Sequence, residues 1–369
     1  MHFLRDYDTG MRRLGFLEIL VGDCSGSSRI ATENLGNMLW SIARENQDEW
    51  LNELAKTRGL KRVEVGRITQ RIAGRFVKLA TEFGLLTEGS LKTLTDLGRL
   101  FKLFRKKRFF IDSNVGQEII LIREFLRKDG LVFPEIIEHI VKSKASSTNE
   151  VFNWFVSEFI KNTLTQMQED LDTHLVERFL SILNSYKSQE PRTKKRGYDR
   201  VKHIVVPRLE NIVDLEIVTK KSGPIYACSD KTVAMYKRIC QPMIEGKSLK
   251  DDDIFYHLAN IYGVSKRASM NAVLRESLIG FDALAEPPLK VVPTEVLSDY
   301  ICISSIVSGE NMILPKDVEK IEKFLSQKFR GKVIFFEDME GRVSHISVPD
   351  EIKEKILARP DEYASQIEE

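Results

Sequence analysis

The residues in this chain with the clearest chemical potential are basic, and they recur at helical spacing. Arg67, Arg71, Arg75 and Lys78 are three or four residues apart, which places them in one row along an α-helix. Guanidinium and ammonium groups in such a row can contact the phosphates of a nucleic acid, and arginine can also bond the edges of guanine bases. The row therefore predicts a nucleic-acid contact. Three polar residues near it are candidates for the same surface: Arg62, Gln70 and Lys92.

Catalytic and metal-binding arrangements are much less evident. The four cysteines are widely scattered, and His139, His203 and His257 have no neighbouring ligand three or four residues further on, so neither a zinc site nor a catalytic triad is predicted. A metal-dependent nuclease would need paired carboxylates and a lysine around the metal. Glu337, Asp338 and Glu340 share one predicted hairpin, but no Glu-x-Lys motif lies beside them. The sequence favours a protein without catalytic residues, metal or cofactor.

The basic row lies beside an apolar stripe that would hold its helix in place. Ile68, Ile72, Phe76, Leu79 and Phe83 recur at steps of four, four, three and four, which predicts a core-facing helix from Val65 to Phe83. Gly84 would end this helix. The next residues predict a short strand, a turn, a returning strand and another helix, at positions 85–87, 88–90, 91–95 and 97–104.

This order, with a cationic first helix, resembles the second half of a winged-helix domain, a form of the helix-turn-helix. The resemblance lies in the order of elements and in residues 83–86 and 95–98, where that family turns into and out of its wing. It implies a reader helix in the major groove of double-stranded DNA and a wing on the backbone. Helices at 30–44 and 48–57 would support the reader helix, giving a basic winged-helix domain at residues 14–110.

A cluster of cations follows this domain and alternates with phenylalanines. Such a cluster can bind phosphates and stack on bases, but it could equally be a solvated hinge whose phenylalanines belong to the core. The candidate residues are Arg105, Lys106, Lys107 and Arg108.

Residues 117–242 repeat the pattern and predict a second winged-helix domain, with a helical insertion at about 150–187. Residues 187–196 read as a basic linker, 201–213 as a reader helix, 215–219 and 225–228 as wing strands. Pro207 means that this helix is kinked or begins afresh there. The aromatic residues of the insertion need a cover, either another domain or a partner protein. The DNA-binding candidates here are Arg192, Lys194, Lys195, Arg196, Arg200, Lys202, Arg208, Lys220 and Lys221.

The C-terminal part has the opposite charge. Residues 58–108 contain 14 basic and 4 acidic residues, a net charge of +10, whereas residues 243–369 contain 16 and 23, a net charge of −7. Helices followed by a β-hairpin at 332–337 and 342–348 resemble a third winged-helix unit. Its acidic surroundings should repel phosphate, so residues 243–369 are predicted to be an α+β docking domain for a protein partner or a second copy.

The predicted fold is therefore mainly α with short β-hairpins: tandem winged-helix domains followed by an α/β C-terminal domain. No apolar run is long enough for a membrane span and no secretory signal is evident, so a cytoplasmic, nucleoid-associated protein is expected. One functional hypothesis is a sequence-specific or structure-directed binder of double-stranded DNA, the recognition subunit of a prokaryotic defence or regulatory complex. The alternative is a winged-helix adaptor that binds a protein in a chromosome-organising complex.

Overall fold

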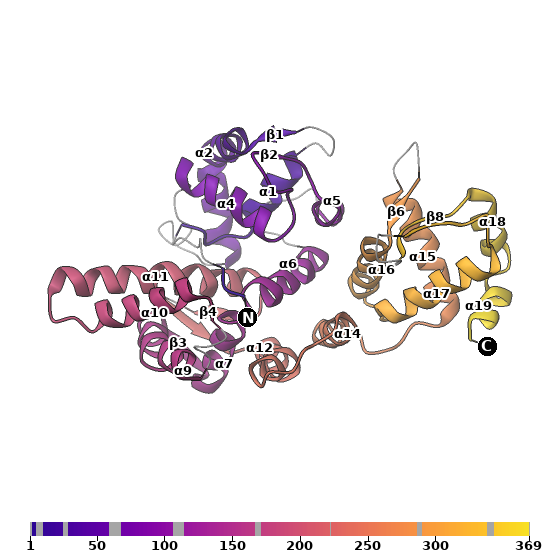
Figure 1. The fold of residues 1–369 in the computed structure, drawn as a ribbon. Helices are drawn as coiled ribbons and strands as arrows, with labels where there is room; N and C mark the ends of the chain where they lie inside the picture. The colour runs from indigo at the N-terminus through magenta and orange to yellow at the C-terminus, as the bar shows by residue number, and fades with distance from the viewer. Residues whose placement is uncertain are drawn as a thin grey trace. The chain divides into compact units, whose positions relative to one another are not determined.

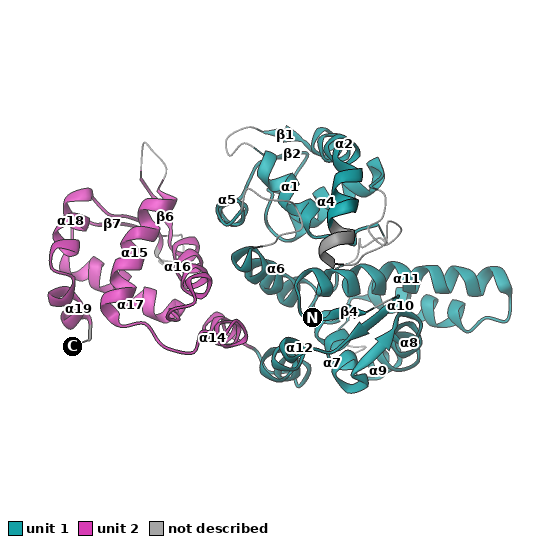
Figure 2. Ribbon diagram, turned by 180° about the vertical axis from the view of Figure 1, so that it is seen from behind, with its two compact units in different colours: residues 1–248 teal, residues 249–369 magenta. Residues whose placement is uncertain are grey.

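A computed structural model of the chain describes residues 2–4, 10–24, 29–58, 68–105, 114–166, 171–221, 223–285, 290–337 and 343–368. The chain divides into two compact units, unit 1 at residues 1–248 and unit 2 at residues 249–369 (Figure 2). Helices dominate both units, and the strands are short and antiparallel (Figure 1). The prediction of a mainly α fold with short β-hairpins is confirmed.

The first part of unit 1 is a cluster of helices closed by a very small sheet. Its elements are α1 (Gly15–Asp23), β1 (Ile30–Ala31), α2 (Thr32–Arg58), α4 (Gln70–Glu82), β2 (Leu91–Lys92) and α5 (Asp96–Leu103). Strand β1 pairs with β2, and Leu86 forms an isolated antiparallel bridge with Leu94. Thr69 and Thr95 are the N-cap residues of α4 and α5. Their side-chain oxygens accept hydrogen bonds from the backbone amides of Ile72 and Gly98.

The second part of unit 1 holds a three-stranded sheet in the order β3-β5-β4. A π-helical turn at Phe155–Phe159 joins α8 to α9. A second π-helical turn, Tyr236–Cys240, joins α12 to α13. The other elements are α6 (Val115–Lys128), α7 (Phe133–Ser143), β3 (Ala145–Ser147), α8 (Thr148–Trp154), α9 (Ile160–Gln166), α10 (Thr173–Tyr186), α11 (Pro191–Asp214), β4 (Thr219–Lys221), β5 (Ile225–Ala227), α12 (Asp230–Met235) and α13 (Gln241–Ile244).

Unit 2 holds the third sheet, in the order β6-β8-β7. The hairpin of β7 and β8 confirms the strongest strand prediction in the sequence. The elements of unit 2 are α14 (Asp251–Ile261), α15 (Met270–Leu284), β6 (Val292–Pro293), α16 (Thr294–Ser308), α17 (Pro315–Lys328), β7 (Ile334–Glu337), β8 (Val343–Ser347), α18 (Asp350–Ala358) and α19 (Pro360–Glu368).

Two stretches of the chain, from α7 to β5 and from α15 to β8, share the order helix, strand, helix, helix, strand, strand. The stretch from α1 to β2 follows the same order, except that an isolated bridge at Leu86 stands in place of the middle strand. Each time the first strand pairs with the last, as β1 with β2, β3 with β5, and β6 with β8. The middle strand pairs with the other edge of the last strand in two cases, as β4 with β5 and β7 with β8. In the first case Leu86 forms an isolated bridge with Leu94, which follows β2. In the second occurrence, α8 and α9 run on through their π-helical turn as one helical stretch, and α10 is inserted between that stretch and α11.

Several predicted boundaries are wrong. Residues 48–57 are not a separate helix but the end of α2. The predicted linker 187–196 is largely helical, because α11 begins at Pro191, a residue favoured at the first helical position, and continues through Pro207. Strand β4 begins at Thr219 rather than at Leu215, since the chain first turns through Glu216, which has a positive φ of 55°.

Candidate nucleic-acid interface

Helix α4 separates an apolar face from a cationic one. Ile72, Phe76 and Leu79 are buried, and the Phe76 ring lies 5.3 Å from that of Phe16 on α1. Arg71 and Lys78 are exposed, and Arg75 between them is half-buried. The structure therefore places these three cations along one side of a helix whose other side is fixed in the core. Gln70 is also exposed at the start of this helix, where its amide donates to Asn37 Oδ1 at 2.5 Å.

A second cationic surface lies on the first half of α11. Helices α10 and α11 lie side by side as a hairpin (Figure 1). Gly197 makes this close approach possible, because a Cβ atom there would lie 2.4 Å from the Tyr186 nitrogen. Arg200 donates to Ser181 Oγ of α10 at 2.6 Å, and Lys202 is half-buried. The exposed candidates of this half are Arg192, Lys194, Lys195, Arg196 and Arg200.

The second half of α11 is buried, contrary to the prediction that residues 201–213 form an exposed reader helix. All residues from Ile204 to Asp214 are buried. The guanidinium of Arg208 contacts the carboxylate of Asp129 through Nε and Nη2 at 2.6 and 2.7 Å, and both side chains are fully buried. Nη2 also donates to the carbonyl of Leu4 at 3.0 Å. This half of α11 therefore binds the N-terminal segment of the chain and is not exposed for contact with DNA.

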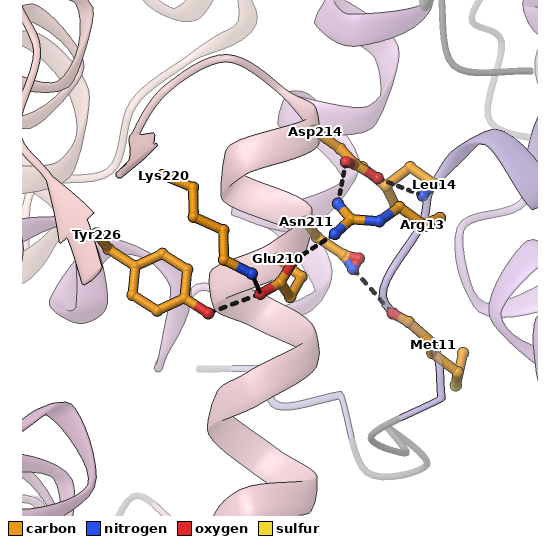
Figure 3. A network of polar contacts seen from close by, with 8 residues as sticks. All are labelled: Met11, Arg13, Leu14, Glu210, Asn211, Asp214, Lys220 and Tyr226. Atoms are coloured by element: carbon orange, nitrogen blue, oxygen red, sulfur yellow. Dashed lines mark hydrogen bonds and ion pairs between the residues drawn. The ribbon is translucent and has the colours of Figure 1, made fainter. Parts of the chain in front are cut away.

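A network of buried charges strengthens this attachment (Figure 3). Arg13 bridges Glu210 and Asp214 of α11 at 2.5 and 2.6 Å, and the Leu14 amide donates to Asp214 at 2.8 Å. Glu210 Oε1 also accepts from Lys220 and from the Tyr226 hydroxyl, both at 2.7 Å. Burial alone would raise the pKa of Glu210, but the nearby Arg13 and Lys220 outweigh it and hold that pKa below its ordinary value.

Three residues predicted to contact DNA are not available on the surface. Arg208 and Lys220 form ion pairs with the buried carboxylates of Asp129 and Glu210, and the Lys220 side chain is only 8% exposed. Lys92 is buried and its ammonium donates to the Thr87 carbonyl at 2.9 Å. Burial also lowers the pKa of Lys92. Because a phosphate contact requires access, none of these three can make one in this fold.

The other candidates are placed individually or lie outside the described residues. Lys221 is exposed on β4, and Arg105 is exposed after α5, where it lies 3.4 Å from Glu18. The predicted candidates that fall outside the described residues are Arg62, Arg67, Lys106, Lys107 and Arg108.

The aromatic segment at 151–186 is covered by the chain itself. Phe152, Phe155 and Phe159 are buried, and Phe155 and Phe159 pack with Phe179 of α10. The cover of these three phenylalanines therefore comes from the segment and its neighbouring helices, and not from a partner protein.

The sequence did not indicate two residues of the buried ion pairs, Arg13 and Asp129. Arg13 and Asp129 received no role, because their partners lie 201 and 79 positions away in the chain. The spacing of residues along the chain does not indicate such distant pairs.

Within the described residues, no group of three or more His, Cys, Asp and Glu side chains is arranged to hold a metal ion. Nor is any described helix both long and apolar enough to cross a membrane.

Comparisons of the chain with protein-family models, with curated proteins and with solved structures find no match. The functional inference therefore rests on the geometry and chemistry of the chain.

Proposed function

We propose that this chain binds double-stranded DNA through unit 1, with α4 as the helix that enters the major groove. The cationic side of α4, opposite its buried stripe, is the observation that carries the proposal. A helix fits the major groove, and arginines on its exposed side can reach phosphates and guanine edges. The core contacts of Ile72, Phe76 and Leu79 would hold that side outward.

The order of elements supports a winged-helix interpretation of the three repeats. In such a domain the helix before the hairpin reads DNA, and the hairpin is the wing. Helix α4 has this place in the first repeat, followed by the turn at 88–90 and β2. In the second repeat the corresponding part of α11 is buried, so we assign its DNA contact to the exposed cations of the first half of α11.

We further propose that the protein is the recognition subunit of a larger assembly, such as a prokaryotic defence or regulatory complex. The adaptor alternative rested on uncovered aromatics at 151–186, and the burial of Phe152, Phe155 and Phe159 withdraws that support.

The decisive test changes Arg71, Arg75 and Lys78 together to Ala. Affinity for a fluorescein-labelled duplex of about 30 base pairs is measured by anisotropy over a series of salt concentrations. We expect the parent to bind with a steep salt dependence and the triple variant to bind at least about tenfold more weakly. Its log–log salt slope should be smaller by about 3, since each phosphate contact contributes about 0.9.

A matched control removes the same charge from other exposed positions of unit 1, with Lys161, Lys237 and Arg238 changed to Ala. This control should bind within about twofold of the parent, because non-contacting surface charges act only through screened long-range fields. Equal losses in both triple variants would show that net charge, and not the α4 surface, determines binding. A parent that fails to bind at low salt would refute the proposal.

A further inference from the structure

Helix α17 in unit 2 has the same place in its repeat as α4 has in the first. It follows the helix that comes after the first strand, and the hairpin of β7 and β8 follows it. The two helices have similar lengths, 13 residues in α4 and 14 in α17. They can therefore be compared position by position from their first residues.

Their buried faces have the same register. Counting from the first residue of each helix, positions 7 and 11 are buried in both. These positions are Phe76 and Ala80 in α4, and Ile321 and Leu325 in α17. The alignment is thus fixed by burial and does not depend on where a helix boundary is drawn.

With that register, the cations of the two helices coincide. Positions 2, 6 and 9 are Arg71, Arg75 and Lys78 in α4. The same positions in α17 are Lys316, Lys320 and Lys323, and all three are exposed. Residues so spaced lie along one side of a helix, so α17 repeats the cationic face of α4 although unit 2 is acidic as a whole.

Nearby acidic residues offset this face only in part, and one of them, Asp252 of α14, accepts a hydrogen bond from the Lys316 amide at 3.1 Å. Asp317 is buried and bonds Arg267 at 2.7 Å, and Glu322 is half-buried. Glu319 is exposed and pairs with Lys323 at 2.7 Å, so one carboxylate competes directly with one of the three cations. Lys328 at the end of the helix, and Arg330 and Lys332 between the helix and the hairpin, are also exposed.

We infer that the α17 face is a second DNA-contact surface, formed by Lys316, Lys320 and Lys323 and supplemented by Arg330 and Lys332. This inference rests on the proposed function, because it assigns to unit 2 the same ligand, duplex DNA. It replaces the expectation that the acidic unit repels phosphate: charge summed over a unit does not describe the local field at one face. Lysines, which act as point charges, suit backbone contacts better than bidentate base recognition.

The test uses the full chain with Lys316, Lys320 and Lys323 changed to Ala, and the same labelled duplex and salt series as above. We expect about a tenfold loss of affinity at low salt and a log–log salt slope smaller by about 2 to 3. The control changes Arg275, Lys290 and Arg359 to Ala, which removes the same charge from exposed positions elsewhere in unit 2. It should bind within about twofold of the parent.

The outcomes separate this inference from the function on which it rests. If the parent binds, the α4 variant is weakened and the α17 variant behaves like its control, then unit 1 binds DNA and the inference is overturned. If the parent does not bind, both proposals fall. Mass spectrometry after lysine acetylation gives an independent reading: duplex DNA should protect Lys316, Lys320 and Lys323 but not exposed Lys355 on α18. Equal labelling of all four with and without DNA would contradict the inference.

Discussion

Arg208 shows how burial changes what a cation does. Its side chain is fully buried, and two of its nitrogens bond the equally buried carboxylate of Asp129. Two charges removed from water are tolerated only because they neutralise each other and their hydrogen bonds are satisfied. The same guanidinium donates to the carbonyls of Leu4 and Ile204, so it joins the N-terminal segment, α11 and the residue that follows α6.

Changing Arg208 to Ala should destabilise unit 1 by about 3 to 5 kcal/mol, because it leaves the carboxylate of Asp129 buried without its counter-charge. Urea denaturation followed by circular dichroism measures this loss. Arg200→Ala is the control on the same helix, since Arg200 is exposed; it should change the free energy of unfolding by less than about 0.5 kcal/mol. If Arg208→Ala were as stable as the parent but bound DNA more weakly, Arg208 would contact DNA and would not stabilise the core.

The exposure of a residue can be predicted from the sequence when neighbouring residues in the chain determine it, and not when distant residues do. Arg71, Arg75 and Lys78 are exposed or half-buried as expected, because their position beside an apolar stripe follows from helical periodicity alone. Arg208 and Lys220 are equally basic and were also predicted on the surface, yet the Arg208 side chain is fully buried and that of Lys220 is only 8% exposed. Arg208 meets Asp129 through a tertiary contact, and Lys220 meets Glu210 because the chain turns before β4. The periodicity of a helix predicts neither arrangement.

At the scale of elements, the α10–α11 hairpin depends on a glycine. A Cβ at Gly197 would meet backbone atoms of Ser185 and Tyr186 at 2.4 to 2.8 Å, so α10 would have to move away. Gly74 in α4 is different, because a Cβ there meets no described atom within 4 Å. The two glycines thus form a natural pair of test positions within helices of the same unit.

We predict that Gly197→Ala destabilises unit 1 by about 1 to 3 kcal/mol through this overpacking. Gly74→Ala should instead be neutral or stabilising by up to about 1 kcal/mol, because alanine is the better helix former. Chemical denaturation of the two variants measures both effects. If Gly197→Ala were as stable as Gly74→Ala, the two helices would not be in the close contact described here.

The elements themselves were predictable where apolar periodicity or capping was strong. The helix with the stripe Ile72, Phe76 and Leu79, which is α4, and the β7–β8 hairpin are examples that the structure confirms. The first half of α11 was missed, because a run of cations has no apolar stripe and Pro207 suggested a break. The helix continues through Pro207, at an intrinsic cost of about 3 kcal/mol. Burial of residues 204–214 and the ion pairs of Arg208 and Glu210 are available to offset this cost.

At the scale of the whole molecule, each unit has a core of its own, so the two should unfold in separate transitions. Glu322 gives a way to identify the transition of unit 2. Burial, aided by the nearby Glu319, raises the pKa of Glu322 from 4.5 to about 7. Among the described residues, no hydrogen-bond partner reaches its buried Oε1. Between these two pKa values the folded state binds more protons than the unfolded state, so stability falls as the pH rises through this window.

Glu322→Gln should therefore stabilise unit 2 at pH 8 by about 1 to 3 kcal/mol and leave its stability near that of the parent at pH 4.5. Calorimetry of the parent, of Glu322→Gln and of Arg208→Ala at both pH values provides the measurement. Because the substitutions lie in different cores, Arg208→Ala should lower only the unit 1 transition and Glu322→Gln should raise only the unit 2 transition. A single transition that moves with both substitutions would mean that the two units fold as one. In that case a loss of DNA binding in the α17 variant could reflect damage to α4, and lysine protection alone would then decide whether α17 contacts DNA.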